Sequence, residues 1–179
     1  MFEEYLQDAY EFFEIAQKAT QEFDERTARR YYRASVFYTA GAIEAFINYI
    51  ADSFAKAESL SPHEIAFIND KNINFSADKL MLVEKTEFHK LEDKLKFLIK
   101  KFQRDFDFHG NHGWSKLMEF KDFRDSLVHP RQTEDETSVA EYQKKLRRGM
   151  SGVIEVMNSL SKVIFKKPLR KQLLDLIPD

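Results

Sequence analysis

Turn-forming residues are scarce throughout this chain. Its 179 residues include only five glycines and four prolines, well below the usual share of either residue. An all-β fold needs many tight turns, and glycine and proline supply the backbone conformations of most of them. The scarcity therefore argues against an all-β fold and against a disordered tail, and it favours helices joined by few links.

The chain has enough apolar residues for a core, and it has no cysteine. Apolar residues make up 43% of the sequence, with 17 phenylalanines and 7 tyrosines, so one domain of this length can bury a core without cross-links. The lack of cysteine excludes disulfides, thiolate metal sites and a cysteine nucleophile. We expect a single domain over residues 1–179, with no metal and no other cofactor.

No apolar stretch reaches the length of a membrane-spanning helix. Such a helix needs about 18 or more apolar residues, and the longest apolar stretch, residues 34–43, ends at Glu44. The first residues, 1–4, are acidic and lack the layout of a signal peptide. We therefore expect a soluble, cytoplasmic protein that does not associate with a membrane.

Apolar residues recur at helical spacing over most of the chain. The pattern predicts a short last helix from Pro168 to Ile177 and five longer helices, over about residues 3–23, 27–58, 88–103, 116–128 and 138–165. The second helix is the longest, and its uncharged middle places it at the centre of a bundle. Gly41 inside it costs about 1 kcal/mol relative to alanine, so we expect another helix to approach it closely.

Ser61 begins the clearest local helix signal. Ser61 can cap a helix, Pro62 suits the first helical position, and Glu64 stands three residues after the cap, as in a capping box. This signal predicts a short helix to about Ile68.

The links between the helices contain no convincing strand. Residues 69–76 are predicted to form a polar loop, and residues 78–85 leave helix or strand open. Residues 108–113 are predicted to form a loop because they include two glycines and an asparagine, with Ser115 capping the next helix. An acidic linker over residues 133–137 precedes the last long helix. The fold class predicted is an all-α helical bundle with a long central helix.

Charge is unevenly distributed along the chain. The net charge is −2, but residues 1–25 hold eight carboxylates and one lysine. Residues 90–104 hold six cations and two carboxylates, and residues 144–171 hold nine cations and one carboxylate. Such blocks can steer an anionic partner to one face of a protein. The alternative is that they are solvated helix faces, or acidic and basic faces that neutralise each other within the fold.

Arg124, Asp125 and His129 stand together at the end of a predicted helix, which Pro130 should stop. Asp125 and His129 are four residues apart and can touch on one helix face, where the carboxylate would fix the imidazole tautomer and favour its charged form. Arg124 is five residues from His129, about 140° around an ideal helix, but its long side chain can reach the same cleft. The alternative is an ordinary ion pair with a capping histidine.

These residue types suit chemistry on a phosphodiester. Histidine can move protons near neutral pH, and arginine can hold two phosphate oxygens at once.

The segment Arg124-Asp125-Ser126-Leu127-Val128-His129 resembles the R-x4-H motif of the HEPN superfamily (higher eukaryotes and prokaryotes nucleotide-binding). Members of that superfamily typically have a polar residue after the arginine and often a proline after the histidine. Residues 38–46 also resemble the early core helix of these proteins, where an acidic residue, here Glu44, often faces the site. The resemblance covers about residues 30–165 and implies an HEPN-like helical bundle.

The resemblance implies a metal-independent endoribonuclease, often a toxin or an antiviral defence effector. Such proteins work as homodimers in which two Arg–His pairs form one cleft. His129 would then assist attack of the RNA 2′-OH on the adjacent phosphate, and Arg124 would stabilise the phosphorane. Asp125 would orient His129, and Glu44 would support Arg124. The products would be a 2′,3′-cyclic phosphate and a 5′-hydroxyl, and no metal is needed because the substrate supplies the nucleophile. Four basic residues are expected to follow the RNA backbone: Lys144, Lys145, Arg147 and Arg148.

Two other functions stay open. The chain can instead be a non-catalytic HEPN-like adaptor that binds a protein partner or a nucleotide, or a helical interaction domain unrelated to the superfamily. An antitoxin is one kind of protein partner that we consider. His109 and His112 supply only two of the ligands that zinc requires, so we do not expect a metal there. A glycine-rich phosphate loop is missing, which argues against a nucleoside triphosphatase.

Overall fold

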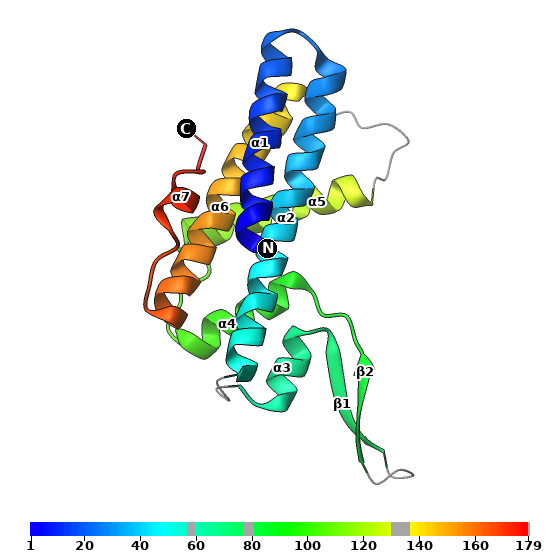
Figure 1. The fold of residues 1–179 in the computed structure, drawn as a ribbon, viewed down its shortest axis with the longest axis vertical. Helices are drawn as coiled ribbons and strands as arrows, with labels where there is room; N and C mark the ends of the chain where they lie inside the picture. Colours follow the sequence, from blue (N-terminus) through cyan, green and yellow to red (C-terminus); the bar gives the residue numbers. More distant parts are fainter. Residues whose placement is uncertain (57–59, 77–80, 130–136, 179) are drawn as a thin grey trace. The chain divides into compact units, whose positions relative to one another are not determined.

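The computed structural model describes residues 1–56, 60–76, 81–129 and 137–178. Seven helices and one two-stranded sheet follow each other in these residues (Figure 1). In chain order they are α1 (Phe2–Gln21), α2 (Glu25–Lys56), α3 (Pro62–Ile68), β1 (Lys71–Ser76), β2 (Met81–Thr86), α4 (Leu91–Phe102), α5 (His112–Val128), α6 (Val139–Phe165) and α7 (Lys171–Leu174). The predicted helical bundle is confirmed, with the hairpin as its one departure from an all-α fold. No helix in the described ranges is long and apolar enough to cross a membrane.

The chain forms two compact units. The first, called here the helical unit, comprises Met1–Ile43 and Asp105–Asp179. The second, called here the hairpin unit, comprises Glu44–Arg104. Helix α2 contributes residues 25–43 to the helical unit and its remaining residues to the hairpin unit.

A chain of aromatic rings joins the four long helices of the helical unit. Phe13 of α1 meets Tyr32 of α2 with 5.8 Å between ring centroids. Tyr32 stacks on Tyr142 of α6 at 6.2 Å, and Tyr142 meets Phe123 of α5 at 5.4 Å. All four residues are buried. Because each aromatic side chain can remove some 150–250 Å² from water, this chain is the centre of the unit's core.

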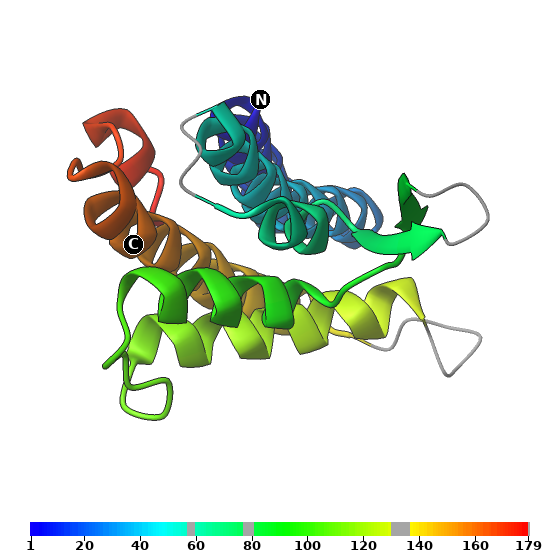
Figure 2. The ribbon, with the colours of Figure 1, turned by 90° about the horizontal axis from the view of Figure 1, so that it is seen from below.

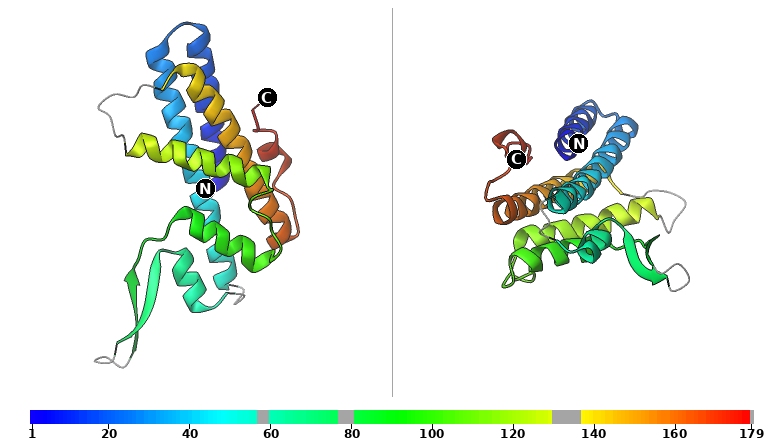
Figure 3. Two further views of the ribbon diagram at one scale, coloured as in Figure 1. Left: turned by 180° about the vertical axis from the view of Figure 1, so that it is seen from behind. Right: turned by 60° about the horizontal axis from the view of Figure 1, so that its bottom comes forward.

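Helices α5 and α6 cross in close contact (Figure 3, left). The approach depends on Gly149 and Gly152 of α6, which are both buried. A Cβ atom at Gly152 would lie 2.7 Å from the backbone nitrogen of Leu117 in α5, and one at Gly149 would overlap the ring of Phe120. On α2, the close neighbour expected at Gly41 is the Tyr5 ring of α1, 3.2 Å from the position that a Cβ would take.

The chain after α6 folds back over the end of that helix (Figure 2). The Leu169 N–H donates to Asn158 Oδ1 at 3.0 Å, and the Ser161 hydroxyl donates to the Lys167 carbonyl at 2.8 Å. Arg170 also pairs with Glu3 of α1 at 3.0 Å. The predicted last helix, residues 168–177, is therefore a short turn of helix within a segment held by polar contacts.

The hairpin unit begins its short helix as the sequence predicts. The Ser61 hydroxyl accepts from the Glu64 N–H at 3.3 Å, and the Glu64 carboxylate accepts from the Ser61 N–H at 2.8 Å, so the capping box is complete. Helix α3 then ends at Ile68, as predicted. The unit's core consists of aliphatic side chains from α2, α3 and α4, among them Ile50, Ile68, Leu95 and Leu98.

The prediction of a polar loop over residues 69–76 was wrong. Residues Lys71–Ser76 form β1, which pairs antiparallel with β2 from Lys71↔Thr86 to Ser76↔Met81. Within the open range 78–85, residues 81–85 are strand, and residues 78–80 lie outside the described residues. The prediction failed because asparagine and lysine are depleted in strands. The pairing of the two backbones compensates for Asn72 and Asn74.

The prediction of a loop up to residue 113, capped by Ser115, was also wrong. Helix α5 begins at His112, and the side chain of Asn111 caps it by accepting from the Trp114 N–H at 2.8 Å. Helix α4 begins at Leu91, three residues later than predicted. Helix α5 ends at Val128 as predicted, whereas Pro130 and residues 133–136 of the acidic linker lie outside the described residues.

Candidate functional site

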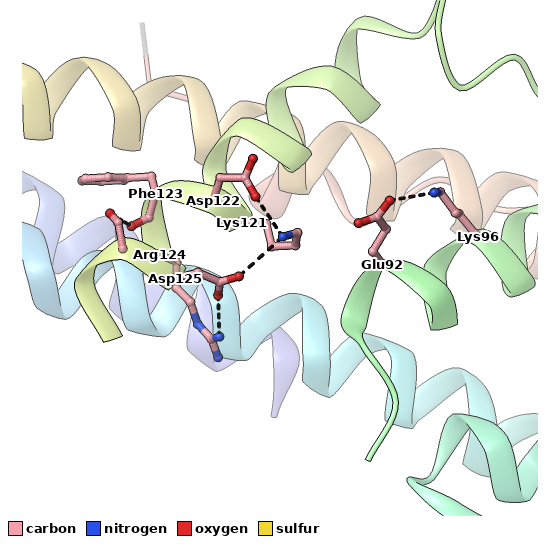
Figure 4. Close-up of polar contacts among 8 residues, drawn as sticks. Glu92, Lys96, Lys121, Asp122, Phe123, Arg124 and Asp125 are labelled. Atoms are coloured by element: carbon pink, nitrogen blue, oxygen red, sulfur yellow. Dashed lines mark hydrogen bonds and ion pairs between the residues drawn. The ribbon is translucent and has the colours of Figure 1, made fainter. Parts of the chain in front are cut away.

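The last turns of α5 carry the motif residues on the side of the helix that does not form the core. Trp114, Leu117, Phe120 and Phe123 are buried at three-residue intervals. Arg124 follows Phe123 and is directed away from its ring (Figure 4). The Arg124 side chain is partly exposed, with 32% of its surface accessible.

Asp125 lies between two cations (Figure 4). Its Oδ1 accepts from Arg124 Nη1 at 2.9 Å, and its Oδ2 pairs with Lys121 Nζ at 3.4 Å. Lys121 also donates to Asp122 at 2.8 Å. The hydrogen bond to Asp122 and the charges of both carboxylates raise the pKa of Lys121, although burial opposes them. The result is a polar cluster on one turn of α5 that holds the Arg124 guanidinium.

His129 lies at the end of the helix with its side chain exposed. Its backbone N–H still donates to the Asp125 carbonyl at 2.9 Å, but its φ of −121° and ψ of 66° have left the helical region. Spacing of four residues predicts contact only while the helix continues. Among the described residues, the Asp125 carboxylate contacts Lys121 and Arg124 and makes no side-chain contact with His129.

Three of the four predicted RNA-binding cations line an open groove between α5 and α6 of about 1020 Å³. They are Lys144, Lys145 and Arg148. Arg147 is the fourth, and its guanidinium lies 5.9 Å from the ring of Phe13 on α1 instead. Among the described residues, neither Arg124 nor His129 lines this α5–α6 groove, although Ser126 of the motif segment does.

The charge of the α5–α6 groove is nearly balanced. Four cations (Lys116, Lys144, Lys145, Arg148) and three carboxylates (Glu119, Asp122, Glu141) line it. Arg148 holds Glu119 with two hydrogen bonds of 2.6 and 3.1 Å, and Lys145 pairs with Glu141 at 2.6 Å. The hydrogen bonds from Arg148 lower the pKa of the Glu119 carboxyl. Among the described residues, Lys144 makes no ion pair.

Sequence reasoning missed the cations and carboxylates of α5 that surround the motif. Lys121 is four residues before Asp125, so helical spacing alone would have indicated this pair. Glu119 on α5 and Arg148 on α6 are 29 residues apart in sequence, so no local pattern indicates that they pair.

The sequence also singles out Glu44, His109 and His112. Glu44 belongs to the hairpin unit, so its predicted support of Arg124 stays a prediction. His109 and His112 are exposed. Among the described residues, no three histidine, aspartate or glutamate side chains gather as metal ligands would.

Comparison of the chain with protein-family models, with curated proteins and with solved structures finds no match.

Proposed function

We propose that this chain is a metal-independent, HEPN-like endoribonuclease that cleaves RNA by attack of the 2′-OH on the adjacent phosphate. The observation that carries the proposal is the end of α5, where the Arg124 guanidinium, held by Asp125, and the exposed His129 imidazole are five residues apart. We place it among toxin or antiviral effector proteins that act on RNA in the cytoplasm.

The reaction needs a base, an acid and a stabiliser of negative charge. The imidazole of His129 removes the proton of the 2′-OH as its oxygen bonds to phosphorus. The bond from phosphorus to the 5′-oxygen then breaks, and that oxygen takes a proton from an imidazolium. A homodimer supplies one His129 as base and the second copy's His129 as acid. The two products are a 2′,3′-cyclic phosphate and a 5′-hydroxyl.

Arg124 acts on the charge of the phosphorane. Its planar guanidinium can donate two parallel hydrogen bonds to the non-bridging oxygens. The contacts at Asp125 indicate that this carboxylate positions Arg124, in place of the predicted orientation of His129. Among the groove cations, Lys144 is available for a phosphate contact, whereas RNA would compete with Glu141 and Glu119 for Lys145 and Arg148.

The proposal is tested by incubating the protein with labelled cellular RNA in EDTA. The wild-type chain should produce fragments with 2′,3′-cyclic phosphate ends, and His129→Ala should produce none while its thermal midpoint stays nearly unchanged. His109→Ala removes another exposed histidine and is the matched control, which should keep wild-type activity. Cleavage by His129→Ala, or loss of wild-type cleavage in EDTA, would contradict the proposal.

A second test concerns the shape of the guanidinium. Arg124→Lys keeps the positive charge but loses the planar pair of donors, so we expect most of the activity to be lost. Wild-type rates in this variant would remove Arg124 from the reaction.

The balanced charge of the α5–α6 groove favours a second candidate function. A groove whose cations are paired with carboxylates and whose walls include Phe120 and Phe123 also suits an amphipathic segment of a partner protein, such as an antitoxin. If neither wild type nor His129→Ala cleaves any RNA, this non-catalytic adaptor becomes the better interpretation. Binding to a captured partner should then weaken in Lys144→Glu.

A further inference from the structure

The hairpin unit contains a small polar cavity. It measures about 290 Å³, at the lower end of the size range of small-molecule pockets. Its polar walls come from four segments of the hairpin unit: Glu44 and Asn48 on α2, Asp70 before β1, His89 after β2, and Lys94 on α4. Phe88 stands beside them.

An ion pair between the buried Lys94 and the partly exposed Asp70 supplies the hydrogen-bond donor of this cavity. Lys94 is only 8% exposed, and its ammonium donates to Asp70 Oδ2 at 2.6 Å. The other Asp70 oxygen accepts from the His89 backbone N–H at 2.8 Å. Burial acts to raise the pKa of Asp70, but these two hydrogen bonds outweigh it and lower that pKa. Both Asp70 oxygens are thus engaged in the folded protein.

Lys94 retains donors that face no partner among the residues that the structure describes. An ammonium has three N–H groups, and among the described residues the Lys94 side chain uses one of them, on Asp70. The Lys94 side chain is only 10% exposed, so its ammonium has lost much of its hydration. Binding a ligand acceptor there would therefore cost little further desolvation.

The opposite chemistry comes from α2. Glu44 and Asn48 are four residues apart on a helix and therefore share one face, and both line the cavity. A carboxylate only accepts hydrogen bonds, and it has room for several donors at once. A ligand that fits this cavity therefore presents an acceptor toward Lys94 and donors toward Glu44.

An aromatic ring completes the cavity. Phe88 lines it but is 87% exposed, although a phenylalanine is ordinarily among the more buried residues. The neighbouring His89 ring is held in place by Phe67, with 4.4 Å between ring centroids. An exposed aromatic ring beside a polar cavity is typical of sites that stack a flat heterocycle.

We propose that this cavity binds the guanine base of a nucleotide. Guanine presents the acceptor O6 next to the donors N1–H and N2–H, which matches Lys94 on one side and Glu44 on the other. It is planar and can stack on Phe88. Adenine lacks this order of groups because its ring N1 is an acceptor and would face the carboxylate. The site lies within the hairpin unit, and the proposal does not depend on nuclease activity.

The test is a calorimetric titration of the full-length protein with GMP, AMP, CMP and UMP. All four ligands carry the same phosphate, so a preference among them reports on the base. We expect GMP to bind with a Kd of about 1 mM or tighter and the other three to bind at least about tenfold more weakly. Phe88→Ala and Glu44→Gln should each weaken GMP binding about tenfold.

Matched controls separate this site from others. Phe23→Ala removes a phenylalanine that is 91% exposed in the helical unit, and Glu11→Gln neutralises an exposed carboxylate on α1; neither should change GMP binding. His129→Ala should also bind GMP normally, whether or not it cleaves RNA. The absence of GMP binding, equal binding of all four nucleotides, or binding unaffected by both cavity variants would each overturn the proposal.

Discussion

At the residue scale, the contacts of Asp125 show how Arg124 is positioned in the candidate site. Its two oxygens each face one cation, Arg124 at 2.9 Å and Lys121 at 3.4 Å. Fixing an arginine side chain costs conformational entropy. The Asp125 carboxylate already fixes Arg124 in the folded protein, so binding of a phosphate by Arg124 would not have to meet this cost. Asp125 therefore organises Arg124, and the His129 side chain is exposed at the helix end.

The first prediction follows from this contact. Asp125→Asn keeps the size of the side chain but weakens its hold on Arg124, so we expect RNA cleavage to fall roughly ten- to a hundredfold. Because both side chains are partly exposed, the unfolding free energy should change by less than about 1 kcal/mol. The control is Asp122→Asn, which contacts Lys121 at 2.8 Å but not Arg124 among the described residues. Equal cleavage rates in the two variants would contradict the role of Asp125.

The second prediction concerns Glu155 of α6. Burial acts to raise its pKa, but hydrogen bonds from Lys116 at 2.7 Å and Ser151 at 2.7 Å outweigh burial and lower the pKa from its ordinary value. A carboxylate with a lowered pKa stabilises the fold above its unfolded pKa, and this contribution is lost as the pH falls through the folded pKa.

Glu155→Gln should therefore destabilise the protein near neutral pH by about 1 kcal/mol or less. The difference from wild type should shrink as the pH falls below about 4.5. Urea unfolding at a series of pH values measures both quantities, and Glu14→Gln, an exposed carboxylate on α1, controls for the loss of one charge. If the stability difference between wild type and Glu155→Gln grew as the pH fell, the pKa of Glu155 would be raised in the folded protein, which would contradict the prediction.

At the element scale, the packing of α5 on α6 depends on missing side chains. A Cβ at Gly152 would lie 2.7 Å from the backbone nitrogen of Leu117, and a helix backbone cannot move away as a side-chain tip can. The tight crossing brings Glu119 of α5 and Arg148 of α6 within hydrogen-bond distance, so the same contact builds the α5–α6 groove.

The third prediction is that Gly152→Ala destabilises the fold. Overpacking costs about 1–3 kcal/mol, and the gain in helix propensity offsets about 1 kcal/mol of this at most. Gly41→Ala is the matched helical control, because its Cβ would meet only the Tyr5 ring at 3.2 Å, and it should be neutral or mildly stabilising. Thermal and urea unfolding measure the stability of both variants. Equal stability of the two would mean that α5 can move to make room for the Cβ at residue 152, which would contradict the prediction.

At the scale of the whole molecule, the proposed reaction requires two chains. One copy supplies a single imidazole at the end of α5, and a two-fold axis would bring a second copy of the same surface to it. The fourth prediction is that an excess of His129→Ala, mixed with wild type and allowed to exchange subunits, lowers the cleavage rate, because a mixed dimer holds only one of the two imidazoles. A cleavage rate that stays unchanged, although mass analysis shows that subunits have exchanged, would contradict a shared cleft.

Most of the helices could be predicted because the spacing of apolar residues along a helix follows its 3.6-residue turn. The apolar stripe predicted α6 to within one residue of its bounds, and the residues Ser61, Pro62 and Glu64 predicted α3 together with its capping box. The same local reasoning placed the R-x4-H segment at the end of a helix, where the structure has it.

The errors occur where a distant contact overrides local preference. Gly113 looks like a loop residue, yet it lies in the first turn of α5, where an added Cβ would come within 3.0 Å of Glu155 on α6. Asn72 and Asn74 look like a polar loop, yet the pairing of β1 with β2 makes them part of a hairpin. Tertiary contacts decided both segments, since local propensity is a weak preference.

The sequence by itself determined which segments are helical and which residues stand at the end of α5, because apolar residues repeat with the 3.6-residue period of a helix. Only the tertiary structure decided what those residues touch: Asp125 holds Arg124, Arg148 holds Glu119, and Lys94 is buried against Asp70. Which side chains meet depends on how helices cross, on how they are offset along their axes, and on where each helix ends. These features depend on how whole elements pack, and a periodic pattern along one element does not contain that information.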